Sequence, residues 1–282
     1  MYRIVNKRRL NDSVTLMEVE APLVARKCAA GQFICFRLDE YGERVPLTVA
    51  GYDRDAGTVT IIFQIVGKTT MMLGLLEAGD AIADFVGPLG NAVDFSGLGR
   101  VLVIGGGVGC TIALPIARGM SEAGISVDMV AGFRTKDRVI LENEMWEACE
   151  NLYITTDDGT YGLRGNTTDM LHKLVNAGNS YDRVDAVGPE VMMKYVSRAA
   201  KRYGLPVAVS LNPIMVDGAG MCGCCRVTVG GEVKFACVDG PEFDGALVDW
   251  DELIQRNSFY KELENEAMEH VCRLTGELRI TL

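Results

Sequence analysis

Short runs of alternating polar and apolar residues fill the first third of the chain, up to residue 97. Turn residues such as Asn11-Asp12 and Asp55-Ala56-Gly57 separate these runs. The pattern predicts strands at residues 1–5, 13–20, 33–38, 44–50 and 58–66. A helix at residues 71–76, with Thr69 as its N-cap, interrupts them, and a turn at residues 87–90 closes the region. Short strands at this spacing are typical of an antiparallel β-barrel or sandwich.

The pattern changes at residue 100, where the apolar residues become continuous. Residues 101–104 are all apolar, which is typical of a strand buried on both faces of a parallel sheet. We expect further strands at residues 126–131, 152–155, 183–187 and 207–211, and helices at residues 111–123, 139–149, 167–176 and 191–203. Strands that alternate with helices predict an α/β domain with a Rossmann-like parallel sheet. The chain therefore combines an all-β part with an α/β part.

A glycine turn joins the first strand of the α/β part to its helix. The turn consists of Gly105, Gly106, Gly107, Val108 and Gly109. A strand, a glycine turn and a helix in this order place the pyrophosphate of a dinucleotide at the helix N-terminus. Cys110 stands where the dinucleotide fingerprint has its third glycine, so a plain tight turn is the alternative.

Two other loops of the α/β part are candidate nucleotide contacts. Arg134 and Lys136 follow the second strand, where an NAD-binding unit usually carries an acid for the ribose hydroxyls. They could meet a 2′-phosphate, which would favour NADP, or they could be solvated loop charges. Gly188 and Pro189 follow the strand at residues 183–187, at the edge where open α/β sheets bind ligands.

The β-rich part holds two more candidate ligand motifs. Gly67, Lys68, Thr69 and Thr70 open its helix with a lysine and free backbone N–H groups, which suits a phosphate or pyrophosphate. A capped surface helix is the alternative. The segment Arg44-Val45-Pro46-Leu47-Thr48 places an arginine, a rigid proline and a hydroxyl at a strand start, although composition alone favours an ordinary strand.

Four of the nine cysteines lie close together in the segment at residues 215–243, namely Cys222, Cys224, Cys225 and Cys237. Plant-type [2Fe–2S] sites have the spacing C-x4-C-x2-C, followed by a distant fourth cysteine. Here Asp217 takes the first position, and Cys222, Cys225 and Cys237 take the others. The spacing therefore favours an iron–sulfur cluster with one aspartate ligand.

Three glycines in the same segment, Gly218, Gly220 and Gly223, support a cluster, because the backbone could wrap it and point N–H groups at its sulfurs. A structural zinc site and ordinary buried cysteines are two alternatives. A third is a cluster bound by Cys224, with Asp217 free. No second C-x-x-C unit is present, and His172 and His270 lie far away in sequence, which disfavours zinc.

Length, charge and cysteine content narrow the class of protein. The 282 residues, 48% of them hydrophobic, allow two domains and a small third lobe. The net charge of −10 argues against a nucleic-acid partner, because phosphate binding needs a basic surface. No apolar stretch reaches about 20 residues, so we expect no membrane span. Nine cysteines without a secretion signal indicate the cytoplasm and argue against a disulfide framework.

The C-terminal segment follows an acidic stretch at residues 249–252. We expect a polar helix at residues 252–271 and a short, partly apolar tail at residues 274–282. The helix either packs on the body of the protein or docks a partner subunit.

Taken together, these motifs resemble the ferredoxin-reductase-like electron-transfer subunits over nearly the whole chain. The resemblance is carried by residues 44–48, 67–70, 105–109, 131–137, 157–159, 187–189 and, most specifically, 211–243. It implies an FAD-binding β-barrel at residues 1–97, an NAD(P)-binding Rossmann-like domain at residues 98–211, and a [2Fe–2S] lobe with a terminal helix at residues 212–282.

The resemblance also implies roles for these residues. Pro46, Leu47 and Thr48, with Arg44, would lie along FAD, and residues 67–70 would hold its pyrophosphate. Residues 105–109, Gly188 and Pro189 would hold the pyridine nucleotide, with Arg134 and Asp158 as further contacts.

Two branches of this family are relevant, and they differ at the cluster. The small subunits of bifurcating NADH-dependent reduced ferredoxin:NADP oxidoreductases use one aspartate and three cysteines, which matches Asp217, Cys222, Cys225 and Cys237. Cys224 is then a bystander. The dihydroorotate dehydrogenase electron-transfer subunits have a fourth cysteine where this chain has Asp217, so we favour the bifurcating branch. That branch uses NAD(H), against the hint of NADP(H) from Arg134 and Lys136.

The family implies an oxidoreductase subunit of the ferredoxin reductase type. NAD(H) would exchange a hydride with FAD, and FAD would exchange single electrons with the cluster. The electrons would pass to a larger flavin and iron–sulfur subunit in a heterodimer or larger complex, and indirectly to ferredoxin. The alternatives are an electron-transfer subunit for dihydroorotate or sulfide oxidation, a zinc-stapled nucleotide-binding module, and a structural subunit that has lost its cofactors.

Overall fold

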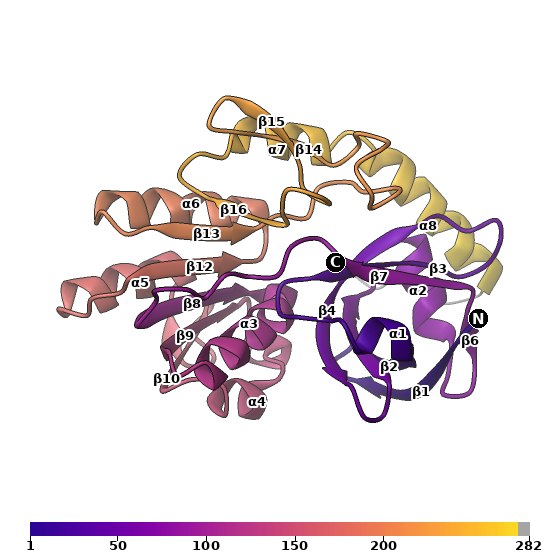
Figure 1. The fold of residues 1–282 in the computed structure, drawn as a ribbon, viewed down its shortest axis with the longest axis horizontal. Helices are drawn as coiled ribbons and strands as arrows, with labels where there is room; N and C mark the ends of the chain where they lie inside the picture. Colours follow the sequence, from indigo (N-terminus) through magenta and orange to yellow (C-terminus); the bar gives the residue numbers. More distant parts are fainter. Residues whose placement is uncertain (276–282) are drawn as a thin grey trace.

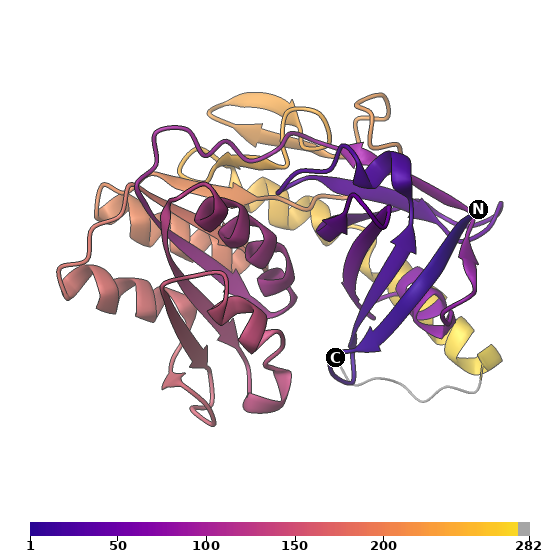
Figure 2. The same ribbon diagram turned by 60° about the horizontal axis from the view of Figure 1, so that its bottom comes forward.

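The computed structural model describes residues 1–275, and side-chain surroundings as far as residue 270. Figure 1 shows three parts in chain order: an antiparallel sheet rolled into a barrel, a parallel sheet between helices, and a small C-terminal lobe. Figures 1 and 2 both show the lobe lying across the same side of the two larger parts. The expected combination of an all-β part and an α/β part is confirmed.

Seven antiparallel strands form the barrel, in the order β6-β1-β2-β5-β4-β3-β7. They are β1 (Tyr2–Arg9), β2 (Val14–Glu20), β3 (Phe33–Arg37), β4 (Val45–Asp53), β5 (Thr58–Gln64), β6 (Ala81–Ile82) and β7 (Asp84–Leu89). The edge strands β6 and β7 are consecutive in the chain, so the sheet nearly closes on itself. Side chains alternate across each strand, and in β5 the buried positions Val59, Ile61 and Phe63 point into the barrel core.

Two details of the barrel differ from the sequence-based predictions. Helix α2 (Lys68–Leu75) begins after Gly67, so the prediction of Thr69 as N-cap is wrong. The reason is Thr70, whose hydroxyl accepts hydrogen bonds from the backbone N–H groups of Val66 and Gly67 and closes the turn earlier. The expected turn at residues 87–90 is also wrong, because β7 continues to Leu89 and pairs with β3. A short helix, α1 (Pro22–Ala25), was not predicted.

The second sheet has the order β11-β10-β9-β8-β12-β13-β16, and only β16 runs antiparallel. Its strands are β8 (Arg100–Gly106), β9 (Ser126–Phe133), β10 (Asn151–Thr156), β11 (Leu163–Arg164), β12 (Arg183–Val187), β13 (Val207–Ser210) and β16 (Glu242–Asp244). Its helical segments are η1 (Gly107–Gly109), α3 (Cys110–Glu122), η2 (Lys136–Arg138), α4 (Glu142–Trp146), α5 (Thr167–Asn176) and α6 (Glu190–Arg202).

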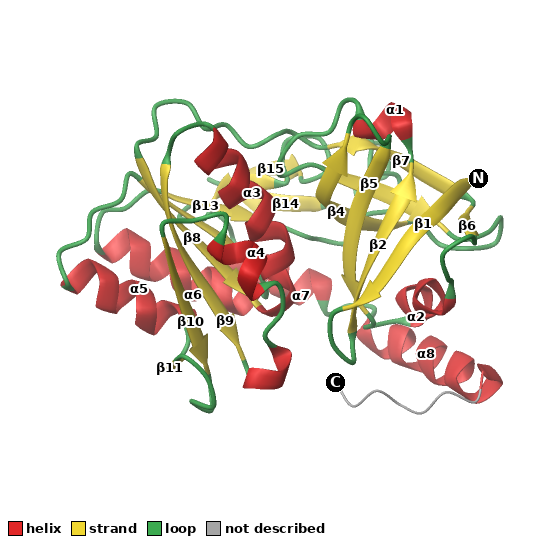
Figure 3. Cartoon of the chain, turned by 90° about the horizontal axis from the view of Figure 1, so that it is seen from below, coloured by secondary structure: helices red, strands yellow, loops and turns green. Residues whose placement is uncertain are grey.

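Helices cover both faces of this sheet, as Figure 3 shows. In β8, Val101 and Val103 pack toward α3 and α4, whereas Leu102 and Ile104 pack toward α5 and α6. This two-sided burial explains the continuous apolar run in the sequence. Helix α4 is shorter than the expected helix at residues 139–149, because Leu141 adopts a left-handed conformation (φ 56°) just before it.

The C-terminal lobe contains the hairpin β14 (Arg226–Val229) and β15 (Glu232–Phe235), followed by α7 (Trp250–Asn257) and α8 (Lys261–Thr275). The prediction of one helix at residues 252–271 is therefore wrong, since the chain breaks it between residues 257 and 261. Helix α8 lies against α2 of the barrel (Figure 3). Most of the expected tail at residues 274–282 lies outside the described residues. Among the described helices, none has the length and apolar character needed to cross a membrane.

Candidate functional site

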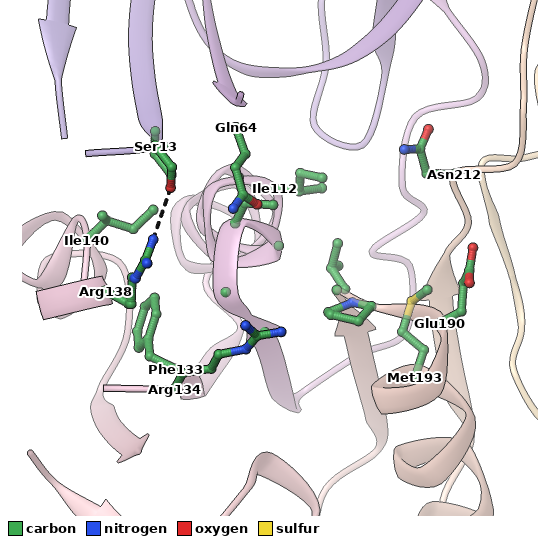
Figure 4. Close-up of a pocket in the computed structure, with 18 of the residues that line it drawn as sticks. Ser13, Gln64, Ile112, Phe133, Arg134, Arg138, Ile140, Glu190, Met193 and Asn212 are labelled. Atoms are coloured by element: carbon green, nitrogen blue, oxygen red, sulfur yellow. Dashed lines mark hydrogen bonds between the residues drawn. The ribbon is translucent and has the colours of Figure 1, made fainter. Parts of the chain in front are cut away.

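A cavity of about 610 Å³ lies between the barrel and the carboxyl end of the parallel sheet. We call it the crevice. Its polar lining residues are Asn11, Ser13, Gln64, Arg134, Arg138, Glu190, Ser210 and Asn212. Figure 4 shows side chains from the barrel and from the parallel sheet on its opposite walls. Its volume is typical of small-molecule and cofactor pockets, and its place is where open α/β sheets bind ligands.

The glycine turn after β8 forms one wall of the crevice and packs tightly on the neighbouring loop. A Cβ atom at Gly109 would lie 2.4 Å from the carbonyl oxygen of Val187 and 2.6 Å from Cα of Gly188. A Cβ atom at Gly106 would lie 2.4 Å from Sδ of Met192. The two loops can meet this closely because glycine stands at position 109, whereas the contact at Gly106 is with a flexible side chain of α6. Their contact leaves the start of α3 beside the crevice, where it suits a pyrophosphate.

Two arginines line the crevice beyond the end of β9. Arg134 is exposed, and Arg138 donates a hydrogen bond to the hydroxyl of Ser13 at 3.3 Å, which joins the α/β part to the barrel. Lys136 lies elsewhere, with its Nζ atom 5.3 Å from the ring centre of Tyr161. Of the two cations considered for a 2′-phosphate, Arg134 alone lines the crevice.

The two motifs predicted for FAD lie on the barrel, outside the residues that line the crevice. Pro46, Leu47 and Thr48 are half-buried on β4, and Arg44 precedes them and is exposed. At the start of α2 the hydroxyl of Thr69 donates to the carboxylate of Glu43. A Cβ atom at Gly67 would meet no atom within 4 Å, so the turn borders open space. An open turn with a lysine at a helix N-terminus fits the diphosphate of FAD.

Asp217 anchors the cluster loop, which we define as residues 215–225. Its carboxylate accepts hydrogen bonds from the backbone N–H groups of Ala219 at 2.9 Å, Met221 at 3.0 Å and Cys222 at 2.7 Å. The bond from Ala219 is the main reason that the pKa of Asp217 lies below its ordinary value. Asp217 and Cys222 are thereby held next to each other.

The other two predicted ligands also form a pair. The Sγ atoms of Cys225 and Cys237 are 3.2 Å apart and both residues are buried, and burial raises the pKa of Cys237 to about 12. Cys222 is exposed, and a hydrogen bond from the backbone N–H of Cys224 lowers its pKa. Among the side chains that the structure describes, as far as residue 270, no three His, Cys, Asp or Glu residues converge as a metal site. The four predicted ligands therefore stand as two pairs.

The backbone of the cluster loop fits a [2Fe–2S] group. Gly218, Gly220 and Gly223 have φ values of 72°, 81° and 70°, which side chains rarely adopt. The carboxylate of Asp217 and the thiols of Cys222 and Cys225 on this loop, together with the thiol of Cys237 beyond it, are donors that iron accepts. A Cβ atom at Gly218 would lie 2.8 Å from Leu89 and 3.1 Å from Sγ of Cys35, so the loop packs directly on β7 and β3 of the barrel.

Comparisons with known proteins agree with this geometry. The family model of the iron–sulfur cluster binding domain of dihydroorotate dehydrogenase B matches residues 212–249. The electron transfer subunit of dihydroorotate dehydrogenase B (NAD(+)) from Geobacillus thermodenitrificans is 33% identical over 249 residues, which covers 85% of this chain and 94% of that protein. The chain belongs to the family of these electron-transfer subunits. The resemblance inferred from its motifs is therefore confirmed.

Two relatives match almost the full length of this chain. A Thermotoga maritima homolog of the electron transfer subunit of dihydroorotate dehydrogenase B (NAD(+)) is 46% identical over 277 residues, and the match covers 98% of this chain and 98% of that protein. A structure of NADH-dependent reduced ferredoxin–NADP oxidoreductase, solved for insight into flavin-based electron bifurcation, superposes with a TM-score of 0.91. It is 46% identical, over 96% of this chain and 98% of the other.

The structure brings only some of the predicted site residues to the crevice. Gly106, Gly107, Val108, Gly109, Arg134, Gly188 and Pro189 line it. Gly105 lies in β8 and is buried, and Asp158 instead accepts hydrogen bonds from the backbone and hydroxyl of Thr160. Asn11, Ser13, Gln64, Arg138 and Asn212 line the crevice but were not predicted as site residues. They come from turns, a strand end and the short helix η2, with no local motif, so only the folded chain shows them.

Proposed function

We propose that this chain is an electron-transfer flavoprotein subunit that passes electrons between NAD(H), FAD and a [2Fe–2S] cluster. The proposal rests on the match between this chain, over nearly its full length, and the oxidoreductase structure. It is supported by the crevice and the cluster loop, which both lie against the same barrel. When bound, these groups would supply the conversion between hydride transfer and single-electron transfer. The protein itself would bind, orient and shield them.

The proposed roles follow the geometry. The glycine turn and the Gly188-Pro189 loop would hold NAD(H) in the crevice. Residues 44–48 and 67–70 would hold FAD, and Asp217, Cys222, Cys225 and Cys237 would hold the cluster. The corresponding domain boundaries are residues 1–97, 98–211 and 212–282. Strand β16 lies at the end of the cysteine segment and pairs with β13. The lobe therefore contributes a strand to the sheet of the nucleotide-binding part.

The proposed setting is an electron-bifurcating NADH-dependent reduced ferredoxin:NADP oxidoreductase. There the chain would work with a larger flavin and iron–sulfur subunit, in a reducing compartment such as the cytoplasm. Asp217 at the first ligand position supports this setting over dihydroorotate oxidation. The 33% identity to dihydroorotate dehydrogenase B electron transfer subunits keeps that second function as the alternative. Purification of the native complex separates the two, since the larger subunit differs.

An anaerobic absorption spectrum of the purified chain, recorded before and after addition of NADH, tests the proposal. Iron, zinc and flavin are quantified on the same sample. We expect flavin and iron, and bleaching of both absorption bands by NADH. A sample that contains zinc but no flavin would contradict the redox function and would indicate a metal-stapled nucleotide-binding module instead.

A further inference from the structure

The crevice has two chemically different ends. Arg138 and Ser13 lie at one end, and Glu190, Met193 and Asn212 lie together at the other (Figure 4). The glycine turn lies between them, where a pyrophosphate would bind. A carboxylate repels phosphate groups, and the 2′-phosphate of NADP(H) is on the adenosine half, so the end with Glu190 suits the nicotinamide half of a pyridine dinucleotide. In that half the ribose hydroxyls and the carboxamide of the nicotinamide can donate hydrogen bonds to a carboxylate, and the carboxamide is the donor farthest from the pyrophosphate.

The C-terminal lobe holds Glu190 in place. Glu190 is the first residue of α6, and its carboxylate accepts a hydrogen bond from the side-chain amide of Asn257. Asn257 is the last residue of α7, and the same amide nitrogen lies 3.5 Å from the backbone oxygen of Asn212. A carboxylate has about four acceptor positions, so the bond from Asn257 leaves Glu190 free to accept others.

We propose that Glu190 accepts a hydrogen bond from the nicotinamide carboxamide and that Asn257 is its positioning residue. The inference rests on the proposed binding of NAD(H) in the same crevice and goes beyond it by assigning the recognition of the carboxamide. It also gives α7 of the C-terminal lobe a role in nucleotide binding, 67 positions away in sequence from the carboxylate that it orients.

Equilibrium binding to the full-length protein, measured by titration calorimetry, tests the assignment with three ligands. NAD⁺ carries the carboxamide, its 3-acetylpyridine analogue replaces the amide nitrogen with a methyl group, and ADP-ribose lacks the nicotinamide. We expect the wild type to bind NAD⁺ about tenfold more tightly than the analogue, because a charge-assisted hydrogen bond is lost. In Glu190→Ala that ratio should approach one. The Kd for ADP-ribose, which has no carboxamide, should stay close to its wild-type value.

Two further variants separate positioning from general damage. Asn257→Ala should lower the NAD⁺-to-analogue preference about threefold, since Glu190 stays but loses its orienting bond. Gln255→Ala, on the exposed side of α7, should leave the preference unchanged. Glu190→Gln keeps an acceptor oxygen and should give an intermediate preference. If Glu190→Ala does not fold, Glu190→Gln and the wild-type preference decide the matter.

The outcomes are distinct. A preference for NAD⁺ that survives unchanged in Glu190→Ala or Glu190→Gln overturns the assignment, and so does a wild type that binds NAD⁺ and the analogue equally. An unchanged preference in Asn257→Ala removes the positioning role. A wild type that binds neither NAD⁺ nor ADP-ribose refutes the proposed function itself, and the inference falls with it.

Discussion

Replacing Gly109 with alanine should destabilise the protein and weaken nucleotide binding together. The new Cβ atom would lie 2.4 Å from the carbonyl oxygen of Val187, whereas real Cβ contacts stay at or above 3.0 Å. The loop or the end of β12 must therefore move by at least 0.6 Å (3.0 − 2.4). Both contact atoms nearest to Gly109 belong to the backbone, so no rotamer change can relieve the clash. Overpacking of this kind costs about 1–3 kcal/mol.

Thermal unfolding and NAD⁺ titration measure the two effects. A cost of about 2 kcal/mol corresponds to a fall in Tm of roughly 4–8 °C for a chain of this size. The Kd for NAD⁺ should rise about tenfold, because the displaced loops both line the crevice. Gly107→Ala is the control for Tm: its Cβ atom meets nothing within 4 Å, and only its φ of 56° costs about 1 kcal/mol. A Gly109→Ala variant that matches Gly107→Ala in Tm and wild type in Kd would refute the tight packing of the two loops.

Three further changes test the barrel, the cluster loop and the strand that joins the lobe to the sheet. Thr70→Val removes the acceptor for two backbone N–H groups, so calorimetry should show a free energy of unfolding lower by about 1–2 kcal/mol. FAD should be lost on gel filtration. An unchanged FAD content would contradict the pyrophosphate site. Asp217→Ala should lower the iron content per chain, whereas iron equal to wild type would count against Asp217 as a ligand. Burial raises the pKa of Glu242 from 4.5 to about 7, so the folded state favours the protonated carboxyl group. The free energy of unfolding therefore falls as the pH rises from 4.5 through about 7. Glu242→Gln should therefore be more stable than wild type at pH 8, by about 3 kcal/mol at most, with a smaller difference at pH 5; a Tm difference that does not change with pH would refute this.

The elements best predicted from the sequence are those whose pattern is local. Helix α5 begins and ends at the predicted residues because Asn166 caps it, accepting hydrogen bonds from the backbone of Thr168 and Asp169, and because its apolar residues recur with helical spacing. Strand β12 was predicted at its observed bounds because apolar residues occupy three of its five positions, although Asp185, paired with Arg183, interrupts them. The spacing of the cysteines is also local, so the position of the cluster loop could be predicted from the sequence alone.

The parts that were missed depend on contacts between distant segments. Hairpin β14–β15 has little burial on β15 and so carries no clear alternation. Gln64 and Ser13 reach the crevice only because the barrel packs against the parallel sheet. Asp158 and Lys136 follow strands at positions that looked suitable, but Asp158 accepts hydrogen bonds from Thr160, Nζ of Lys136 lies over the ring of Tyr161, and neither residue lines the crevice. Spacing along the chain cannot reveal such competition.

The lobe is fixed to both larger parts, and this bears on the proposed electron path. Beyond the pairing of β16 with β13, the backbone N–H of Asn91 donates to the carbonyl of Gly240 at 2.7 Å, and a Cβ atom at Gly90 would lie 2.9 Å from Pro241. At the other end of the cysteine segment, Gly218 lies against Cys35 and Leu89 of the barrel. Because strand pairing and close backbone contacts hold the cysteine segment (residues 215–243) near both of its ends, a path between the crevice and the cluster loop would require no rigid-body movement of the lobe. Control of electron flow would then depend on what occupies the crevice and on the partner subunit.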